Sequence, residues 1–265
     1  MFELTSNYNQ IKDRKEKIES DTSKFEKEVF TKFSEEDAKK IKSALDFMLK
    51  IHLPQKDRVD GMPFASHPLA VAEKVMSMSN DPELVIAALL HDSVEDQADR
   101  IFIERIERKN LSGGLTLKFN ETAKDKYKTT LAAWSFRELD DRYGQRVKYY
   151  VENMTNHDFN SLAEHLNLEG GNKINFINKL YAEHVENIIN DPNLLILKLA
   201  DLTTNINLRS LDPGSEKYQK LKRKYKSVIE NVLEKLKTIP EDNPVYPKKD
   251  AIIKELTQTY EEQYK

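Results

Sequence analysis

The sequence contains no cysteine, few turn-forming residues and no long apolar run. The lack of cysteine excludes disulfide bonds, thiolate catalysis and cysteine-ligated zinc, and it fits a reducing compartment. Only 7 glycines and 9 prolines occur among 265 residues, which argues against an all-β architecture with many tight turns. No apolar stretch approaches the ~20 residues that a membrane-spanning helix needs, and the N-terminus lacks a basic-then-apolar signal pattern. We therefore expect a cytoplasmic, helix-rich protein without membrane contact.

Charge is abundant and nearly balanced. Charged residues make up 33% of the chain and hydrophobic residues 38%, while 42 basic and 45 acidic side chains leave a net charge of −3. Because a dedicated nucleic-acid binder is usually basic, we expect no nucleic acid among the partners. The length suits one large domain or two small ones.

One short stretch concentrates ionisable side chains directly after an apolar run, residues 85–90. His91 and Asp92 follow at the end of the predicted helix, and Glu95 and Asp96 come four residues later, so each pair shares a helix face. A buried histidine beside three carboxylates is costly unless a cation or a proton offsets the charge, and a divalent metal is the simplest such partner. The alternative is a helix C-terminus with ordinary solvated acids.

His67 and Asp201 are candidates for the same site. His67 lies at a predicted helix start, where a histidine is more often a cap or a surface residue, and it becomes a plausible ligand if the fold brings it beside His91. Asp201 interrupts a mostly apolar helix and shares a face with Asn205. A buried aspartate needs a partner, although a capping or salt-bridging role also explains it. Two imidazoles and two carboxylates suit Mn²⁺, Fe²⁺, Co²⁺, Zn²⁺ or Ni²⁺, which activate water and polarise phosphorus–oxygen bonds.

Helical periodicity and breaker residues predict the organisation of the chain. Asp81-Pro82 and Asp191-Pro192 each combine an N-cap with proline at the first helical position. Leu115–Phe119 alternates with period two, which is the pattern of a small β-hairpin near 112–120. Residues 156–173 are polar and predict a loop, followed by a helix at about 175–190. The predicted organisation is a helical arm at 1–33, a main domain at 34–240 with an insertion at about 97–133, and a linker with a packed helix at 241–265.

The N-terminal arm and a basic helix offer possible contacts with other molecules. The arm carries a narrow apolar stripe, which predicts either a helix packed on the main domain or a short coiled coil that joins copies into a homo-oligomer. Residues 220–226 crowd cations onto a helix, and most of this charge forms a solvated face. Arg58 and one or two of these cations are able to hold phosphate groups.

Three segments, in this order, resemble the motifs of RelA/SpoT-type alarmone hydrolases. Residues 58–72 resemble the first motif, residues 87–96 resemble the His-Asp-x-x-Glu-Asp motif, and residues 197–205 resemble the Lys-Leu-Ala-Asp motif with its following asparagine. The Glu-Asp pair after His-Asp is the specific part, since a bare His-Asp indicates only the wide HD phosphohydrolase superfamily. The resemblance covers roughly residues 40–235.

This resemblance implies an all-α HD-domain fold, with a Mn²⁺ or another divalent ion bound between helices. It implies a metal-dependent pyrophosphohydrolase that removes the 3′-pyrophosphate of (p)ppGpp and yields GDP or GTP. Its residue assignments are metal ligands at His67, His91, Asp92 and Asp201, catalytic acids at Glu95 and Asp96, and substrate contacts at Arg58 and Asn205. Tyr225 matches a nucleotide-binding tyrosine by its register alone, and Lys222 or Lys220 is able to substitute for the basic residue that the family places at Leu221.

The sequence departs from the family pattern around the nucleotide pocket. Val59, Phe64 and Leu202 replace a usual basic residue, a tyrosine and a second basic residue. These changes leave the hydrolytic centre intact and leave guanine and adenine alarmones both open. Because the chain ends at Lys265, we expect a stand-alone small alarmone hydrolase, of the kind that neutralises an alarmone-making toxin. The rival interpretations are a phosphohydrolase acting on ppApp or another nucleotide, a non-catalytic nucleotide sensor, and a helical interaction protein that works through its arm.

Overall fold

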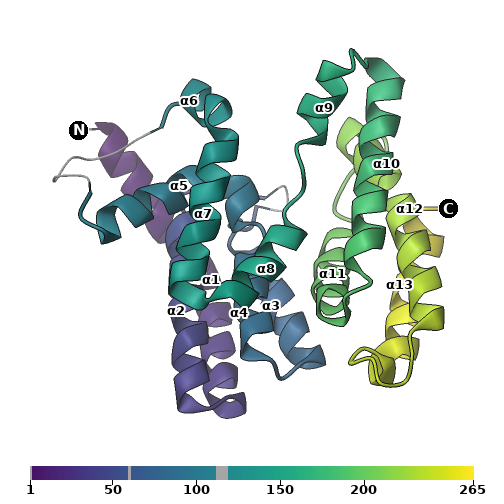
Figure 1. Cartoon of the computed structure of the whole chain (residues 1–265), viewed down its shortest axis with the longest axis horizontal. Helices are drawn as coiled ribbons and strands as arrows, with labels where there is room; N and C mark the ends of the chain where they lie inside the picture. The colour runs from purple at the N-terminus through teal and green to yellow at the C-terminus, as the bar shows by residue number, and fades with distance from the viewer. Residues whose placement is uncertain (1, 59–60, 112–118) are drawn as a thin grey trace. The chain divides into compact units, whose positions relative to one another are not determined.

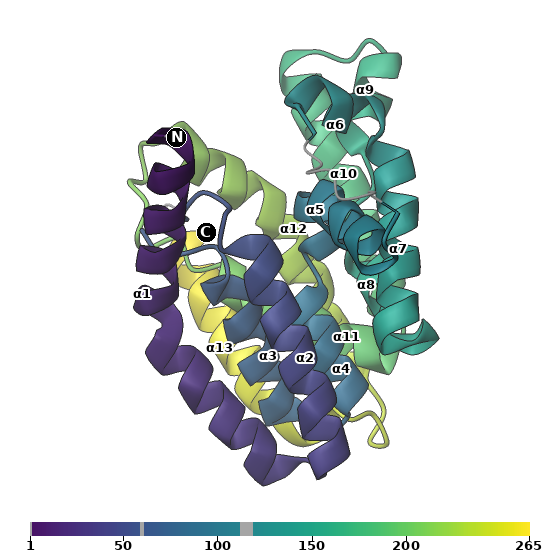
Figure 2. The same ribbon diagram turned by 90° about the vertical axis from the view of Figure 1, so that its left-hand side faces the viewer.

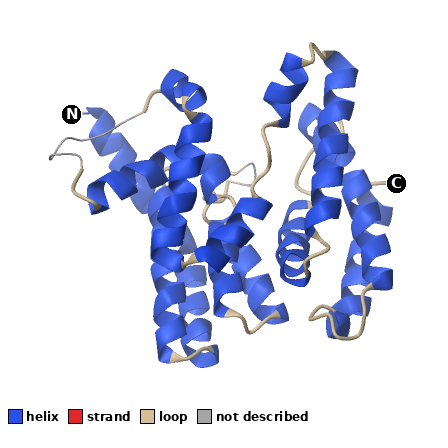
Figure 3. Cartoon of the chain, in the orientation of Figure 1, coloured by secondary structure: helices blue, strands red, loops and turns tan. Residues whose placement is uncertain are grey.

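The chain is all-helical wherever the computed structural model describes it, which is residues 2–58, 61–111 and 119–265 (Figure 1). Helices and loops account for these residues, and no strand occurs among them (Figure 3). The all-α prediction is confirmed, while most of the predicted hairpin near 112–120 lies outside the described residues. The helices are α1 (Phe2–Lys32), α2 (Glu35–His52), α3 (Ser66–Met78), α4 (Pro82–Leu90), α5 (Ser93–Arg108), α6 (Glu121–Lys126), α7 (Lys128–Tyr143), α8 (Gln145–Met154), α9 (Phe159–His165), α10 (Gly170–Ile188), α11 (Pro192–Asn205), α12 (Glu216–Thr238), the 3₁₀ turn η1 (Tyr246–Lys248) and α13 (Lys249–Gln263).

Two compact units divide the chain. Unit 1 runs to Thr155 and contains α1 to α8, and unit 2 begins at Asn156 and contains α9 to α13. The division falls inside the 34–240 span that the sequence predicts as one hydrolase domain, so that span stays a prediction. Among the described helices, none combines the length and the apolar character needed to cross a lipid bilayer.

The core of unit 1 is built around the short helix α4. All its residues from Leu84 to Leu90 are buried, because α4 packs against α2, α3 and α8. Its start follows the predicted signal, since the Asp81 carboxylate accepts hydrogen bonds from the amides of Glu83 and Leu84 at 3.0 and 3.4 Å. A helix buried on all sides leaves little room for movement at its C-terminal end, where the candidate site begins.

The N-terminal arm forms the long helix α1, which packs on α2 and α3 within unit 1 (Figure 2). Its apolar stripe is used there, because Ile18, Phe25 and Val29 are buried. This confirms the packed-helix interpretation, while a homo-oligomer through the arm stays a prediction that needs another surface. Arg14 also donates to the Asp57 carboxylate at 2.6 Å and thereby ties α1 to the loop that carries Arg58.

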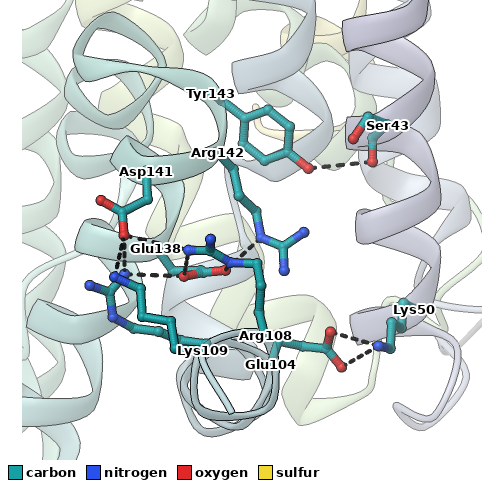
Figure 4. A network of polar contacts seen from close by, with 10 residues as sticks. Ser43, Lys50, Glu104, Arg108, Lys109, Glu138, Asp141, Arg142 and Tyr143 are labelled. Carbon is teal, nitrogen blue, oxygen red and sulfur yellow. Dashed lines mark hydrogen bonds and ion pairs between the residues drawn. The ribbon is translucent and has the colours of Figure 1, made fainter. Parts of the chain in front are cut away.

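A buried carboxylate joins α5 to α7. Glu138 is fully buried, and Arg105, Arg108 and Arg142 all donate to its two oxygens at distances from 2.6 to 3.1 Å. Arg108 and Arg142 point toward Glu138 from two sides in Figure 4. Burial alone works to raise the pKa of Glu138, but hydrogen bonds from Arg108 and Arg142 hold it below its ordinary value. The cluster thus fixes the C-terminal half of α5, whose first turn carries Glu95 and Asp96.

Unit 2 is organised on α10 and α12, which pack against each other, and α13 packs on α12. The Asp191 carboxylate caps α11 as predicted, accepting from the amides of Asn193 and Leu194 at 2.8 and 3.1 Å. The loop predicted for 156–173 is partly wrong, because Asp158 caps the short helix α9. The helix predicted from residue 175 begins earlier, since Gly170, with a positive φ of 53°, is the first residue of α10 and lies within the predicted loop.

Replacing Glu138 by glutamine should destabilise unit 1. Three arginines would lose a buried anionic partner, and breaking such a buried ion pair costs on the order of 3 kcal/mol of unfolding free energy. Urea denaturation at neutral pH measures the change. Glu35→Gln is the matched control, because its exposed pair with Lys39 is screened by water and its loss should leave the midpoint unchanged. Equal midpoints for the two variants would show that the cluster does not hold α5 to α7.

Candidate metal centre

His91 and Asp92 form the connection between α4 and α5. Helix α4 ends at Leu90, His91 is its C-cap residue, and Asp92 is the N-cap residue of α5. The predicted helix end at His91 and Asp92 is confirmed, and a second helix, α5, begins directly after it. The break has a physical cause, since the apolar run ends at Leu90 and the acids that follow are better placed at the N-terminus of a new helix, where its dipole favours negative charge.

Two imidazoles face the carboxylate of Asp92 within unit 1. His67 lies in the first turn of α3, and its Nε2 is 3.5 Å from Asp92 Oδ2. His91 Nε2 is 3.2 Å from Asp92 Oδ1, and the two ring centroids are 5.2 Å apart. Both histidines are buried, with 5% and 2% of their surfaces exposed, so the interpretation of His67 as a surface residue is wrong. The predicted proximity of His67 to His91 is present in this unit.

The tautomer of His91 places an unprotonated ring nitrogen opposite the carboxylate of Asp92. The Nδ1 atom of His91 is 2.8 Å from the carbonyl oxygen of Ala88, and therefore Nδ1 carries a hydrogen and donates it. In the neutral ring the lone pair then sits on Nε2, which faces an oxygen of Asp92. Two acceptors at that distance need a proton or a metal ion between them. A backbone carbonyl that accepts from the second ring nitrogen is the usual support of a metal-binding histidine.

Asp96 lies one turn after Asp92, in the first turn of α5 with Glu95. Part of Asp96 is exposed, yet the protein around its carboxyl group removes enough water to raise its pKa to about 7, with further repulsion from Asp92. A carboxyl group whose pKa lies near neutrality is suited to taking up and releasing a proton. Glu95 is exposed.

Unit 2 holds Asp201 in a polar cluster on α11. Asp201 is buried, its Oδ2 accepts from Lys198 Nζ at 2.9 Å, and its Oδ1 accepts from Asn205 Nδ2 at 2.6 Å. Lys198 in turn reaches the hydroxyl of Tyr181 at 3.1 Å. The shared face predicted for Asp201 and Asn205 is confirmed. The partner that the buried Asp201 requires is Lys198, with which it forms a salt bridge. Within this unit Asn205 donates a hydrogen bond to the carboxylate of Asp201. If Asn205 also contacts the substrate as predicted, its side chain must bind both groups.

The other predicted substrate contacts lie in both units. Arg58 in unit 1 is half-buried. Its backbone amide donates a hydrogen bond to the carbonyl oxygen of Met62 at 2.8 Å. Tyr225 in unit 2 is buried on α12, where its ring meets the edge of Tyr181 at 6.3 Å between centroids. Lys222 is half-buried on the same helix. These roles stay predictions.

Sequence reasoning missed two polar residues beside the site. His52, the last residue of α2, is fully buried, and burial lowers its pKa to about 4. Its Nδ1 is 2.8 Å from Gln55 Oε1, and the amide nitrogen of Gln55 donates to Asp96 Oδ2 at 3.2 Å. A signal existed, because His52 follows Met48 by four residues on the apolar face of its helix, where a polar residue needs an explanation.

The neutral state of His52 predicts a pH dependence of stability. Its pKa is about 4 in the folded chain and about 6.5 when unfolded, so the unfolded chain binds more protons between these values. Stability is therefore lost as the pH falls from about 6.5 to about 4, and His52 contributes roughly 3 kcal/mol to that loss.

Urea unfolding at several pH values, in the presence of a chelator, measures this contribution. The free-energy difference between the wild type and His52→Asn should shrink by that amount across the window. His165→Asn, an exposed histidine in unit 2, is the control and should give a constant difference. A constant difference for His52→Asn as well would show that folding does not lower the pKa of this histidine.

Comparison with known proteins finds one matching family model and several relatives of this chain. The HD domain family model matches residues 44–112, which contain His67, His91 and Asp92. Three relatives are a guanosine-3′,5′-bis(diphosphate) 3′-pyrophosphohydrolase of Aquifex aeolicus, a probable enzyme of the same name from Mycoplasma genitalium, and a GTP pyrophosphokinase of Myxococcus xanthus. They are 28%, 29% and 27% identical to this chain over 64%, 86% and 68% of its length.

These relatives are much longer proteins. The matched regions make up 18%, 33% and 18% of the Aquifex, Mycoplasma and Myxococcus proteins, respectively. The similarity thus concerns one part of each relative. Residues 44–112 therefore match the HD domain family, and the chain is similar to one part of proteins named as guanosine-3′,5′-bis(diphosphate) 3′-pyrophosphohydrolases.

Proposed function

We propose that this chain hydrolyses the 3′-pyrophosphate of (p)ppGpp-like alarmones in a metal-dependent reaction and releases GDP or GTP with pyrophosphate. The observation that carries the proposal is the meeting of His67, His91 and Asp92 in an arrangement that requires a cation. The raised pKa of Asp96, one helical turn away, adds the proton-handling group that hydrolysis needs. The names of the Aquifex and Mycoplasma relatives support this choice of substrate.

The proposed metal ligands are His67, His91, Asp92 and Asp201. Two imidazoles and two carboxylates without a thiolate fit a borderline or hard divalent ion, and we propose Mn²⁺. When bound, the ion supplies Lewis-acid polarisation of the phosphate and lowers the pKa of water. Asp201 comes from unit 2, and its assignment to the site rests on its Lys-Leu-Ala-Asp motif. Lys198 and Asn205 then present its carboxylate to the metal in a fixed orientation.

The protein's own acids handle the protons of the reaction. A water oxygen forms a bond to the phosphorus attached to the 3′ oxygen, the bond between that phosphorus and the 3′ oxygen breaks, and the ribose regains its hydroxyl. The water must lose a proton and the 3′ oxygen must gain one. Glu95 and Asp96 are the proposed groups for both transfers, and an aspartate with a pKa of about 7 exchanges protons readily at neutral pH.

Cationic and polar side chains are proposed to hold the nucleotide. Arg58 and Lys222 supply positive charge for the phosphates, and Tyr225 and Asn205 supply further contacts. The departures from the family pattern at Val59, Phe64 and Leu202 keep an adenine alarmone as the second candidate substrate. A GTP pyrophosphokinase among the relatives makes synthesis from GTP and ATP a further outcome to be measured.

The substrate assay should show Mn²⁺-dependent turnover. Purified protein is incubated with ppGpp, with ppApp, and with GTP plus ATP, each with Mn²⁺ or with EDTA, and the nucleotide products and pyrophosphate are separated. We expect conversion of ppGpp to GDP and pyrophosphate with Mn²⁺ and none with EDTA. A preference for ppApp would change the base, and formation of pppGpp and AMP from GTP and ATP would contradict a purely hydrolytic role.

Two variants should separate metal binding from proton transfer. Asp92→Ala removes a carboxylate from between the two imidazoles and should abolish metal retention, measured by elemental analysis after gel filtration. Glu95→Ala leaves all four ligands intact and should retain the metal while losing roughly 10²–10⁴-fold in turnover, the usual contribution of a positioned acid or base. Full turnover by Glu95→Ala would show that its assigned role is wrong.

A further inference from the structure

A chain of hydrogen bonds connects Ser93 to Asp96 through the side chains of His52 and Gln55. Ser93 Oγ is 3.4 Å from His52 Nε2, His52 Nδ1 is 2.8 Å from Gln55 Oε1, and Gln55 Nε2 is 3.2 Å from Asp96 Oδ2. The chain joins the C-terminal end of α2 to the first turn of α5, and both end residues belong to α5. Neither His52 nor Gln55 has a role in the reaction proposed above.

When Asp96 is ionised, the chemistry of the groups fixes the direction of every bond in the chain. A carboxylate oxygen only accepts, so the NH₂ group of Gln55 must face Asp96. The carbonyl oxygen of Gln55 therefore faces His52, and His52 Nδ1 must carry the hydrogen. Burial keeps the ring of His52 neutral, with its pKa lowered to about 4, so Nε2 bears the lone pair and accepts from the hydroxyl of Ser93.

The ring of His52 cannot rotate freely to another arrangement. It is fully buried and stacks on Phe64, with 5.1 Å between ring centroids and 21° between planes. Phe64 also contacts His67 in an edge-to-face arrangement, with 6.3 Å between ring centroids. One buried imidazole thus supports the side chain of Asp96 through hydrogen bonds and the ring of His67 through aromatic packing.

We propose that His52 and Gln55 are positioning residues that hold the carboxyl group of Asp96 in one orientation. The bond to Oδ2 assigns the other oxygen, Oδ1, to the reacting water, and Gln55 prevents the carboxyl group from turning. The catalytic part of this inference rests on the proposed function, in which Asp96 exchanges a proton with that water. The structural part rests only on the chain of hydrogen bonds.

A pair of substitutions at His52 distinguishes positioning from simple packing. The amide nitrogen of asparagine can replace Nδ1 as a donor to Gln55, whereas that of glutamine reaches the position of Nε2. We expect His52→Asn to keep most of kcat, and His52→Gln to lose roughly 10- to 100-fold, the usual loss when a supporting hydrogen bond is removed. The KM and the metal content of both variants should remain those of the wild type. Equal losses in the two variants would overturn the proposal.

A double-mutant cycle tests whether Gln55 acts through Asp96. Gln55→Met removes both hydrogen bonds of the amide at nearly constant volume, and it should lower kcat in the wild type. In the Asp96→Asn background the same substitution should have no further effect on the residual rate, because the group that Gln55 positions is gone. An equal loss in both backgrounds would show that Gln55 works on another group and would overturn the inference.

A measurement without substrate keeps this inference separate from the proposed function. The ¹⁵N shifts of the His52 ring should report the neutral tautomer with hydrogen on Nδ1, and Gln55→Met should move that hydrogen to Nε2, from which it can be donated to Ser93. A wild-type ring with hydrogen on Nε2, or an unchanged ring in Gln55→Met, would overturn the proposed chain. The expected shifts without any alarmone turnover would support the chain and contradict the proposed function alone.

Discussion

The lone pair of a buried imidazole and an oxygen of a carboxylate are both acceptors, and they lie close together only with positive charge between them. This constraint governs unit 1. The carbonyl of Ala88 takes the hydrogen of His91 Nδ1 and directs the other ring nitrogen to Asp92. His67 reaches the second oxygen of the same carboxylate from α3. A divalent ion satisfies all three groups at once, and the remaining architecture of the unit serves to hold them in place.

Each surrounding element restrains one part of the site. The fully buried α4 fixes the backbone at Leu90, directly before His91. The buried Glu138 cluster fixes the far end of α5, and His52 with Gln55 fixes its first turn through Asp96. Such support matters because metal ligands and catalytic acids must keep their geometry within fractions of an ångström, and their own side chains cannot ensure this.

Local signals in the sequence predicted those parts of the fold that depend on neighbouring residues. Asp81-Pro82 and Asp191-Pro192 predicted helix starts because capping involves amides only two and three residues away. The end of α4 near His91 was predicted, whereas the start of α5 directly after Asp92 was not, because the spacing of Glu95 and Asp96 was read on the same ideal helix. His52 and Gln55 were missed because their partners, Ser93 and Asp96, lie 41 residues away in the sequence, and only the packing of α2 on α5 brings them together.

Two imidazoles and carboxylates of this chain are proposed to bind one divalent metal ion. Pulsed electron paramagnetic resonance of the Mn²⁺-loaded protein tests this binding directly, because nitrogen nuclei bound to Mn²⁺ give characteristic couplings. We expect one tightly bound Mn²⁺ per chain with couplings from two histidine nitrogens, and loss of one coupling in either His67→Gln or His91→Gln. A bound Mn²⁺ without histidine couplings, or no stoichiometric binding, would show that these imidazoles are not metal ligands.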